Sequence, residues 1–461
     1  MDDKKNIVVL GAGISGLSVA YLLKKEGFGV TVLEKKGKVG GSIETIIESG
    51  FLFDRGPNSS LETYPIIKTI IKDLGLSEEL IYADSKGNKR YILKNSKLVP
   101  LPMSPQAFLS SKLFSTKAKL RLLAEPFIKR TNKEESIAEF VKRRIGKEFL
   151  DYAISPFVSG VYAGDPDKLS VKYAFPKLYE MEKKHRSLIL GTIKTIRERK
   201  KRAEKSKQSA KMFSFKKGME TLPNKIASFL DNDLITSAEV QSILKNDGSY
   251  KIVFTKDEEQ KTLIADSVVS TIPAYALSNI ISNTDKNIAE NLNDVFYPSV
   301  LVVYLVYKKT DIHRPLDGFG FLIPQCEGKS FLGAIWNSVL FPHRTDDDNV
   351  CFTLFIGGAT NEKIGKATIE ISIKKAVDEF QNIMRIENEP VYTSHKLWER
   401  AIPQYNTCYQ KIDEAIKDFE RNNPGFFLSG NYRRGIALGD CLHSAEIIRD
   451  EVKSFLLPNG R

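Results

Sequence analysis

The chain has 461 residues, of which 42% are hydrophobic and 27% charged, and its formal net charge is +12 at pH 7. This length suggests roughly two or three globular domains, which can bury enough apolar surface to fold without disulfides or a structural metal. Four scattered cysteines without a CxxC pair argue against a zinc-binding or disulfide-framework protein, and the absence of any apolar run of about 18 residues argues against a transmembrane helix.

The first segment has the pattern of a βαβ unit. Residues 6–10 form an apolar run that predicts a buried strand, residues 14–26 have helical periodicity, and residues 29–34 predict a second strand. The sequence GAGISG, residues 11–16, joins the first strand to the helix. Glycines at this spacing allow a tight turn, a close approach of the backbone to a diphosphate, and close packing of the helix on the strand. We therefore predict that this loop binds a dinucleotide.

Glu34 ends the second predicted strand, 18 residues after Gly16. A carboxylate in this place can accept hydrogen bonds from ribose hydroxyls. Its negative charge would repel a 2′-phosphate, so Glu34 argues against NADP.

The middle of the chain is predicted to be mainly helical. Residues 60–82 have the spacing of a helix followed by a loop. Within residues 104–205, helices are expected over 134–145, 147–159 and 188–204.

Basic residues gather in three stretches, residues 112–130, 142–147 and 194–211. No recognition helix or base-stacking motif accompanies them, so we predict no nucleic-acid partner. Two alternatives stay open. The basic helices with an apolar face could dock on an anionic membrane, or the charges could simply form a solvated surface.

Strand patterns return after residue 234. Residues 239–245 and 250–255 flank the turn sequence NDGS and predict a hairpin, and residues 266–273 predict a buried strand that ends at proline. Further strands are expected over 299–308, 318–323, 330–336, 350–357 and 426–429, and helices over 368–384 and 440–456. This alternation of blocks predicts one discontinuous nucleotide-binding domain with other domains inserted into it.

Several segments resemble the oxygen-dependent protoporphyrinogen oxidase family, which belongs to a larger group of flavin oxidases. KVGGS at residues 38–42 is similar to the R-x-G-G motif of the larger group, with lysine at the usual arginine position. FDRGPNS at residues 53–59 resembles the F-[ED]-x-G-P-[ND]-S segment of the family, and residues 157–170 resemble its signature. Shorter resemblances fall at residues 184–188, 218–222, 397–405 and 430–441.

The resemblance implies an α/β fold in which a Rossmann-type FAD-binding domain carries an inserted α+β substrate domain and a helical membrane-binding domain. The expected boundaries are residues 1–83, 212–280 and 395–461 for the FAD-binding domain, 84–103 and 281–394 for the substrate-binding domain, and 104–211 for the helical insert.

The resemblance also implies FAD as the cofactor. Trp398 would pack near the isoalloxazine ring, and the backbone of Val240 would contact the adenine. Backbone N–H groups before the last helix would meet the pyrimidine edge of the flavin. The predicted FAD residues are Gly11, Ala12, Gly13, Ile14, Ser15, Gly16, Glu34, Lys35, Gly40, Gly41, Ser42, Gly56, Pro57, Asn58, Ser59, Val240, Trp398, Gly430, Ile436, Ala437 and Leu438. No metal site is predicted.

The expected substrate residues follow from the same resemblance. Arg90 matches an arginine that pairs with a propionate, which suits the guanidinium fork. Leu322, Ile335 and Phe355 match positions that clamp the macrocycle. No side chain stands out as a general base, and the backbone carbonyl of Gly160 is the candidate acceptor of a substrate proton.

The implied activity is the oxidation of protoporphyrinogen IX to protoporphyrin IX in heme biosynthesis, in three flavin cycles with O2 as the acceptor and H2O2 as the product. The first alternative is coproporphyrinogen III oxidation by the same mechanism. Two others are a different flavin oxidase, of the amine oxidase or carotenoid desaturase type, and a non-enzymatic FAD-binding protein.

The expected location is the cytoplasm, with peripheral contact on the inner face of the membrane. The first residues run directly into a strand pattern, so no signal peptide is expected. We predict that the four cysteines are small buried residues. We expect the protein to be a monomer or a homodimer and to pass its product to ferrochelatase.

Overall fold

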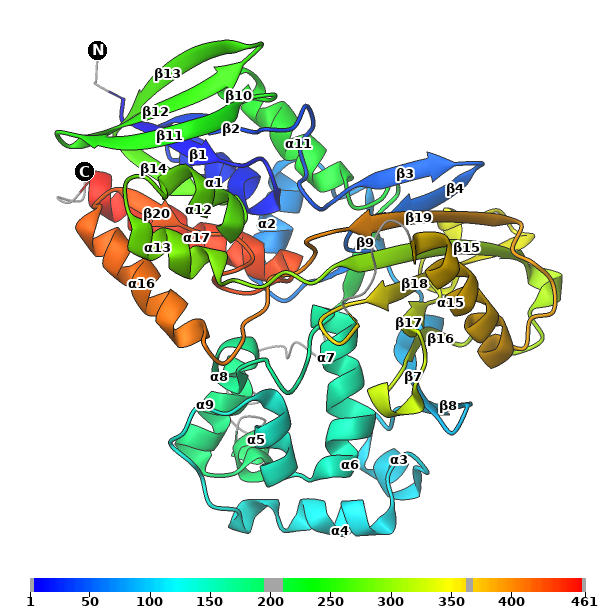
Figure 1. Cartoon of the computed structure of the whole chain (residues 1–461). Coiled ribbons are helices and arrows are strands. Elements are labelled where there is room, and N and C mark those ends of the chain that lie inside the picture. Colours follow the sequence, from blue (N-terminus) through cyan, green and yellow to red (C-terminus); the bar gives the residue numbers. More distant parts are fainter. Residues whose placement is uncertain (1–3, 195–209, 362–367, 458–461) are drawn as a thin grey trace.

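Figure 1 shows the computed structural model, which describes residues 4–194, 210–361 and 368–457. A parallel sheet with its helices, a larger, mainly antiparallel sheet, and a group of helices occupy three regions of the molecule. The α/β fold and the Rossmann-type unit predicted from the sequence are confirmed.

The parallel sheet is assembled from segments far apart in the chain. Its five strands lie in the order β10 (Leu234–Ile235), β2 (Gly29–Leu33), β1 (Asn6–Leu10), β14 (Ser267–Ser270) and β20 (Phe426–Leu428). All neighbouring pairs are parallel. The helix α1 (Ile14–Lys25) connects β1 to β2, and β14 lies on the other side of β1. The order in which strands are added to the sheet therefore reverses at β1. Parallel α/β sheets bind their ligands at such a reversal.

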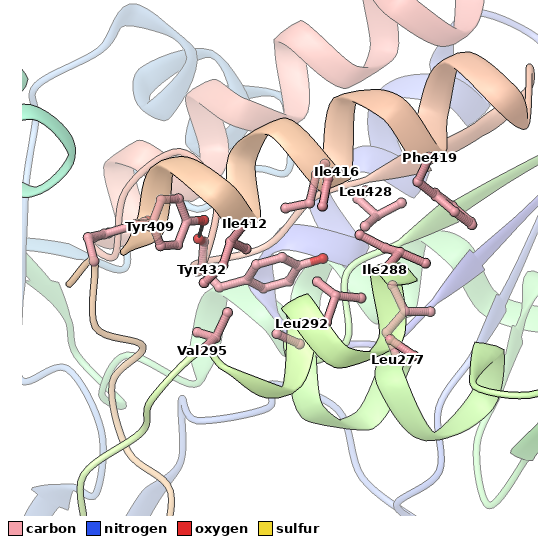
Figure 2. Packing of buried hydrophobic residues seen from close by; sticks show 14 of the residues in the cluster. Leu277, Ile288, Leu292, Val295, Tyr409, Ile412, Ile416, Phe419, Leu428 and Tyr432 are labelled. Carbon is pink, nitrogen blue, oxygen red and sulfur yellow. Dashed lines mark hydrogen bonds between the residues drawn. The ribbon is translucent and has the colours of Figure 1, made fainter. Parts of the chain in front are cut away.

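Alternate residues of β1 enter two different cores. Ile7 and Val9 pack on one face of the sheet, and Val8 and Leu10 on the other. The first face is covered by α1, α2 (Pro65–Asp73), α11 (Thr221–Leu230) and α17 (Leu438–Leu456). The second face is covered by β11 (Glu239–Asn246), β12 (Ser249–Lys256), β13 (Glu259–Ala265), α12 (Ala274–Ile281), α13 (Lys286–Asn293) and α16 (Tyr409–Asn422). Figure 2 shows the side chains of α13 and α16 meeting in this second core.

The larger sheet has seven strands, with neighbours antiparallel except for the parallel pair β16–β7. Their order is β19 (Tyr392–Trp398), β15 (Val300–Lys308), β18 (Asn349–Gly357), β17 (Phe331–Ile335), β16 (Gly318–Leu322), β7 (Lys89–Lys94) and β8 (Lys97–Pro100). The helix α15 (Ile369–Met384) covers one face. The hairpin of β3 (Thr45–Glu48) and β4 (Phe51–Asp54) covers part of the other, where the ring of Phe53 meets that of Tyr304 at 5.0 Å.

The third region consists of short helices. They are α3 (Pro105–Ser110), α4 (Thr116–Leu123), α5 (Ile137–Arg144), α6 (Lys147–Phe149), α7 (Ser155–Tyr162), α8 (Val171–Ala174) and α9 (Pro176–His185). The fully buried Arg144 joins them, because its guanidinium binds both Glu125 and Glu182. Glu125 also accepts a hydrogen bond from the backbone N–H of Leu188 (2.9 Å). Most of the helix predicted over 188–204 lies outside the described residues.

Several elements were not predicted from the sequence. The prediction of a helix in 60–82 is confirmed by α2, but the short strands β5 (Ser60–Leu61) and β6 (Leu80–Tyr82) flank it and pair with β9 (Met212–Phe215).

Cys351 and Cys441 are buried as predicted, whereas the prediction is wrong for Cys326 and Cys408, which are exposed.

The division into three domains stays a proposal. The strand β19 crosses the expected boundary at residue 395, and α13 packs with α12 and α16 although it was expected in the substrate domain. Among the described helices, we find none with the length and apolarity needed to cross a membrane.

Candidate active site

The loop from Gly11 to Gly16 is built so that only glycine fits at its ends. Gly11 has a φ of +94°, and a Cβ there would lie 2.9 Å from Cγ2 of Ile272. A Cβ on Gly16 would lie 1.9 Å from the carbonyl oxygen of Gly11, so glycine allows α1 to pack against the strand end. No side chain caps α1, and its first turn holds no acidic residue. This helix end therefore favours an anion.

A second pair of glycines crosses this loop at contact distance. The N–H of Gly40 donates to the carbonyl of Ala12 (2.8 Å), and Gly13 and Gly40 form a parallel bridge. A Cβ on Gly41 would lie only 3.1 Å from Cα of Gly13. Side chains at these positions would push the two loops apart, and bare backbone of this kind is what a closely approaching diphosphate requires.

Glu34 is fixed beside this crossing. Its carboxylate accepts hydrogen bonds from the N–H groups of Ala12 (2.7 Å) and Lys36 (2.8 Å), and it is half-buried. The oxygens keep lone pairs for further donors, as ribose binding requires. The ammonium of Lys35 binds Glu239 at 2.6 Å on the surface.

The N-terminus of α17 lies next to that of α1. The hydroxyl of Ser15, on the first turn of α1, contacts the thiol of Cys441 on α17. Ala437 is the N-cap of α17 and is exposed, and no side chain caps this helix either. The first turn of α17 holds the acidic residue Asp440, whereas that of α1 holds none, so the end of α1 is the more favourable of the two for an anion. Val240, the residue predicted to contact the adenine, lies on β11 just before a bulge.

The segment Gly56–Ser59 lies between these loops and the larger sheet. A Cβ on Gly56 would lie 1.9 Å from the carbonyl oxygen of Ser42, so this segment touches the second glycine pair. The indole N–H of Trp398 donates to the carbonyl of Arg55 (2.7 Å). Trp398 is therefore held beside the predicted FAD segments, although β19 belongs to the other sheet.

A buried network around Arg344 was missed from the sequence. Its guanidinium binds the carboxylate of Asp54 (2.5 Å) and the carbonyl of Asn58 (2.7 Å), and the side chains of Arg344 and Asp54 are fully buried. The amide of Asn337 donates to Oδ1 of Asn58 (2.7 Å). The side chain of Asn58 is thus engaged within the protein, and its predicted contact with FAD would use the backbone. The segment around Arg344 looks like a surface loop in sequence, so no local signal marks it.

The three predicted clamp residues share one face of the larger sheet. Leu322 lies opposite Gly333, Gly333 lies opposite Phe355, and Ile335 is two residues along the same strand. All three are half-buried. The alternate residues of the same strands point to the opposite face of the sheet and are buried against α15. The face with Leu322, Ile335 and Phe355 is therefore partly open.

The helix α7 forms a second apolar wall opposite this face. A Cβ on Gly160 would lie 2.5 Å from Cδ2 of Leu322, so the helix and the sheet touch there. Phe157 and Val161 flank Gly160 and are 43% and 41% exposed, respectively. They were not predicted as site residues, although their spacing around Gly160 places all three on one side of a helix.

Arg90 stands at the edge of the same face. It pairs with Gly320 in the parallel register of β7 and β16, its side chain is exposed, and its guanidinium lies 5.6 Å from the ring centre of Phe319. An exposed guanidinium beside an apolar surface can bind the carboxylate of an amphipathic ligand.

The ionisable groups of the site suggest binding rather than acid–base chemistry. Burial raises the pKa of Tyr162, Tyr304 and Tyr405. These phenols therefore stay protonated and act as hydrogen-bond donors. Burial opposes ionisation of Glu44, but the hydrogen bond from Lys38 and the nearby positive charges bring the pKa of Glu44 below its usual value.

Comparison with known proteins identifies flavin-dependent oxidoreductases as similar in both sequence and fold. The family model for flavin-containing amine oxidoreductases matches residues 14–447. Protoporphyrinogen oxidase 2 of Arabidopsis thaliana is 35% identical over 98% of this chain and 94% of its own length. Coproporphyrinogen III oxidase of Bacillus subtilis is 29% identical over 99% of both chains. A crystal structure from Exiguobacterium sp. 255-15 matches the fold with a TM-score of 0.80 at 22% identity, covering 98% of this chain and 99% of the other.

Proposed function

Because the chain belongs to the family of flavin-containing amine oxidoreductases, we propose that it oxidises protoporphyrinogen IX to protoporphyrin IX. The chain is an oxidoreductase, and its cofactor is FAD. Its near full-length similarity to protoporphyrinogen and coproporphyrinogen oxidases supports a porphyrinogen as the substrate and heme biosynthesis as the pathway. The observation that carries the proposal is the partly open apolar face of Leu322, Ile335 and Phe355, which lies opposite Gly160.

The reaction removes six electrons and six protons from the macrocycle. When bound, FAD accepts two electrons in each cycle and passes them to O2, so three cycles consume three O2 and release three H2O2. The chain itself must hold a flat apolar macrocycle in one orientation and accept protons from its bridge carbons. It must also bind carboxylates at one edge.

The residues of the candidate site can perform these tasks. Leu322 and the exposed side chains Phe157 and Val161 offer apolar walls on two sides of a flat ligand. Arg90 can bind a propionate through two parallel hydrogen bonds at the edge of the sheet face. Such contacts fix which bridge carbon faces the cofactor.

The carbonyl of Gly160 is our proposed proton acceptor. The N–H groups of Ala163 and Gly164, the next candidates to cover it within α7, bind the carbonyls of Ser159 and Val158 instead. Ala163 has a left-handed backbone (φ +48°), which ends the helix and turns these donors away. An uncovered carbonyl on an exposed residue can accept a proton from the substrate and relay it to water.

We also propose that the helical region docks on an anionic membrane. Five large apolar side chains are exposed on and around α3 and α4, namely Met103, Leu109, Leu120, Leu123 and Phe127. Lys112 and Lys117 lie among them. Apolar side chains interleaved with lysines suit the interface of an anionic bilayer. In this proposal the protein is cytoplasmic, contacts the inner face of the membrane and passes its product to ferrochelatase.

Coproporphyrinogen III is the second candidate substrate. The relative from Bacillus subtilis, named coproporphyrinogen III oxidase, matches this chain over 99% of both lengths. This substrate carries two more propionates than protoporphyrinogen IX, and the net charge of +12 suits an anionic ligand.

One experiment tests both candidates. The purified protein is examined for flavin absorbance, and porphyrin fluorescence is followed with each porphyrinogen in turn. The larger kcat/KM identifies the physiological substrate. A preparation that stays colourless after incubation with excess FAD, or one that oxidises neither porphyrinogen, would refute the proposed function.

A further inference from the structure

The segment between β20 and α17, residues 429–437, is held mainly by side chains from one neighbouring part of the chain. Gly430 (φ +114°) and Gly435 (φ +124°) give it two sharp turns. The hydroxyl of Tyr409 donates to the carbonyl of Tyr432, as Figure 2 shows. Arg433 forms a two-pronged ion pair with Glu420 on α16. The path of the chain into α17 is therefore set largely by α16 and the residues just before it, together with the ion pair of Arg434 and Glu451.

Tyr405 makes the most specific of these contacts. Its hydroxyl donates to the carbonyl of Asn431 (2.7 Å) and accepts a hydrogen bond from the N–H of Gly435 (3.0 Å). One oxygen atom thus closes a turn of five residues. Tyr405 is 3% exposed, and its ring packs edge-to-face on that of Tyr409 at 4.8 Å. Burial raises the pKa of this phenol well above its usual value, so both hydrogen bonds persist throughout the physiological pH range.

We propose that Tyr405 is a positioning residue for the flavin. Gly435 directly precedes Ile436, Ala437 and Leu438, whose N–H groups are proposed to meet the flavin, so the inference rests on the proposed function. No side chain caps α17, and Ala437 at its N-cap is exposed. By binding the N–H of Gly435, the phenol fixes the direction from which the chain enters the helix. This contact sets where the positive end of the helix points.

The contact predicts a specific effect on the flavin. Tyr405→Phe keeps the ring and its packing, but it leaves the carbonyl of Asn431 and the N–H of Gly435 without this partner. These partly buried backbone groups need new partners when the phenol oxygen is lost, so the segment shifts. FAD then leaves the holoenzyme about tenfold faster, a change that corresponds to about 1.4 kcal/mol. The reduction potential of the bound flavin becomes more negative, because the helix end no longer favours negative charge as well.

The experiment compares holoenzymes of wild type and Tyr405→Phe with a matched control. Tyr250→Phe removes another buried phenol of the same core, whose hydroxyl donates to the carbonyl of Pro424 (2.9 Å). FAD release is followed by flavin fluorescence after dilution, and the potential by equilibration with redox dyes. The control is expected to keep both values, even where its melting temperature falls. A merely structural role of Tyr405 would lower the melting temperature alone and would overturn the proposal.

A second variant decides the case if Tyr405→Phe does not fold. Tyr409→Phe removes the hydrogen bond to Tyr432 in the same segment and should change release and potential in the same direction, by a smaller amount. Wild-type values in that variant would then overturn the proposal. A wild-type protein that takes up no FAD would refute the proposed function itself, which is a separate result.

Discussion

Gly41 is a residue at which the predicted FAD site depends on the absence of a side chain. We expect Gly41→Ala to abolish measurable FAD uptake, because the new methyl group would lie 3.1 Å from Cα of Gly13 and would push the two glycine loops apart. The substitution also places alanine in a left-handed conformation (φ +64°), which costs about 1–2 kcal/mol. Gly75→Ala is the matched control. It has nearly the same φ (+68°) but no neighbour within 4 Å. Equal FAD affinities of the two variants would contradict the assignment.

Arg90 tests the substrate face at the scale of one side chain. We expect Arg90→Met to raise KM for the preferred porphyrinogen about tenfold with little change in kcat, because a hydrogen bond to a charged group contributes about 1.5–3 kcal/mol and a remote propionate binds equally in ground and transition states. Steady-state porphyrin fluorescence measures both constants. Lys97→Met removes an exposed cation from the neighbouring strand β8 and should leave them unchanged. A fall in kcat without a change in KM would exclude simple propionate binding.

Arg344 joins elements that are separate in the chain, so its removal should destabilise the fold. We expect Arg344→Met to lower the free energy of unfolding by about 3–5 kcal/mol, because Asp54 would be left as a buried charge without its partner. Lys89→Met is the control, since it breaks the exposed ion pair with Asp317, a kind of pair that contributes at most about 1 kcal/mol. Urea denaturation of both variants gives the comparison, and similar losses would show that Asp54 does not depend on Arg344.

The exposed apolar side chains around α4 make the membrane proposal testable. We expect Leu123→Glu combined with Phe127→Glu to weaken flotation with anionic liposomes at least about tenfold, because burial of each side chain is worth about 1.5–3 kcal/mol. Leu244→Glu with Ile264→Glu changes two exposed apolar residues on the sheet of β11, β12 and β13, and this variant should float like the wild type. If the wild type floats at neither low nor high salt, the proposal is wrong.

At the level of elements, the periodicity of the sequence predicted those helices and strands that have a clear local pattern. The βαβ unit, the hairpin of β11 and β12 and the strands β15 to β18 were expected close to their observed bounds, because neighbouring residues determine them. The strand β7 was missed although it forms a local hairpin with β8, in which Lys94 pairs with Lys97. The helix α16 was missed despite a clear signal, as Ile412, Ile416 and Phe419 lie on one face.

The site divides in the same way. The spacing of Gly11, Gly13 and Gly16 can be read from the sequence. The structure shows the tight turn at Gly11 and the close packing at Gly16 that this spacing predicts. Arg344 and Tyr405 carry no such pattern, because their roles depend on partners brought together by the fold. The sequence therefore predicts which backbone would hold the cofactor, but it does not reveal the buried side chains that keep this backbone in place.

At the scale of the whole molecule, the predicted FAD site draws on segments from both ends of the chain. The loop 11–16, the glycine pair at 40–41 and the N-terminus of α17 meet although about 400 residues separate the first from the last. A ligand bound across them stabilises the entire fold rather than one element.

Hydrogen exchange with and without FAD tests this coupling. We expect FAD to slow exchange of the backbone amides at residues 12–16, 40–42 and 436–441 together, while amides of α15, which covers the far face of the larger sheet, change only through global stability. At a free FAD concentration of 100 times Kd the gain is about 2.7 kcal/mol, which for a chain of this size raises the melting temperature by about 3 °C. Protection limited to residues 12–16 would mean that only the diphosphate loop binds FAD, because the flavin contact at α17 would then be absent.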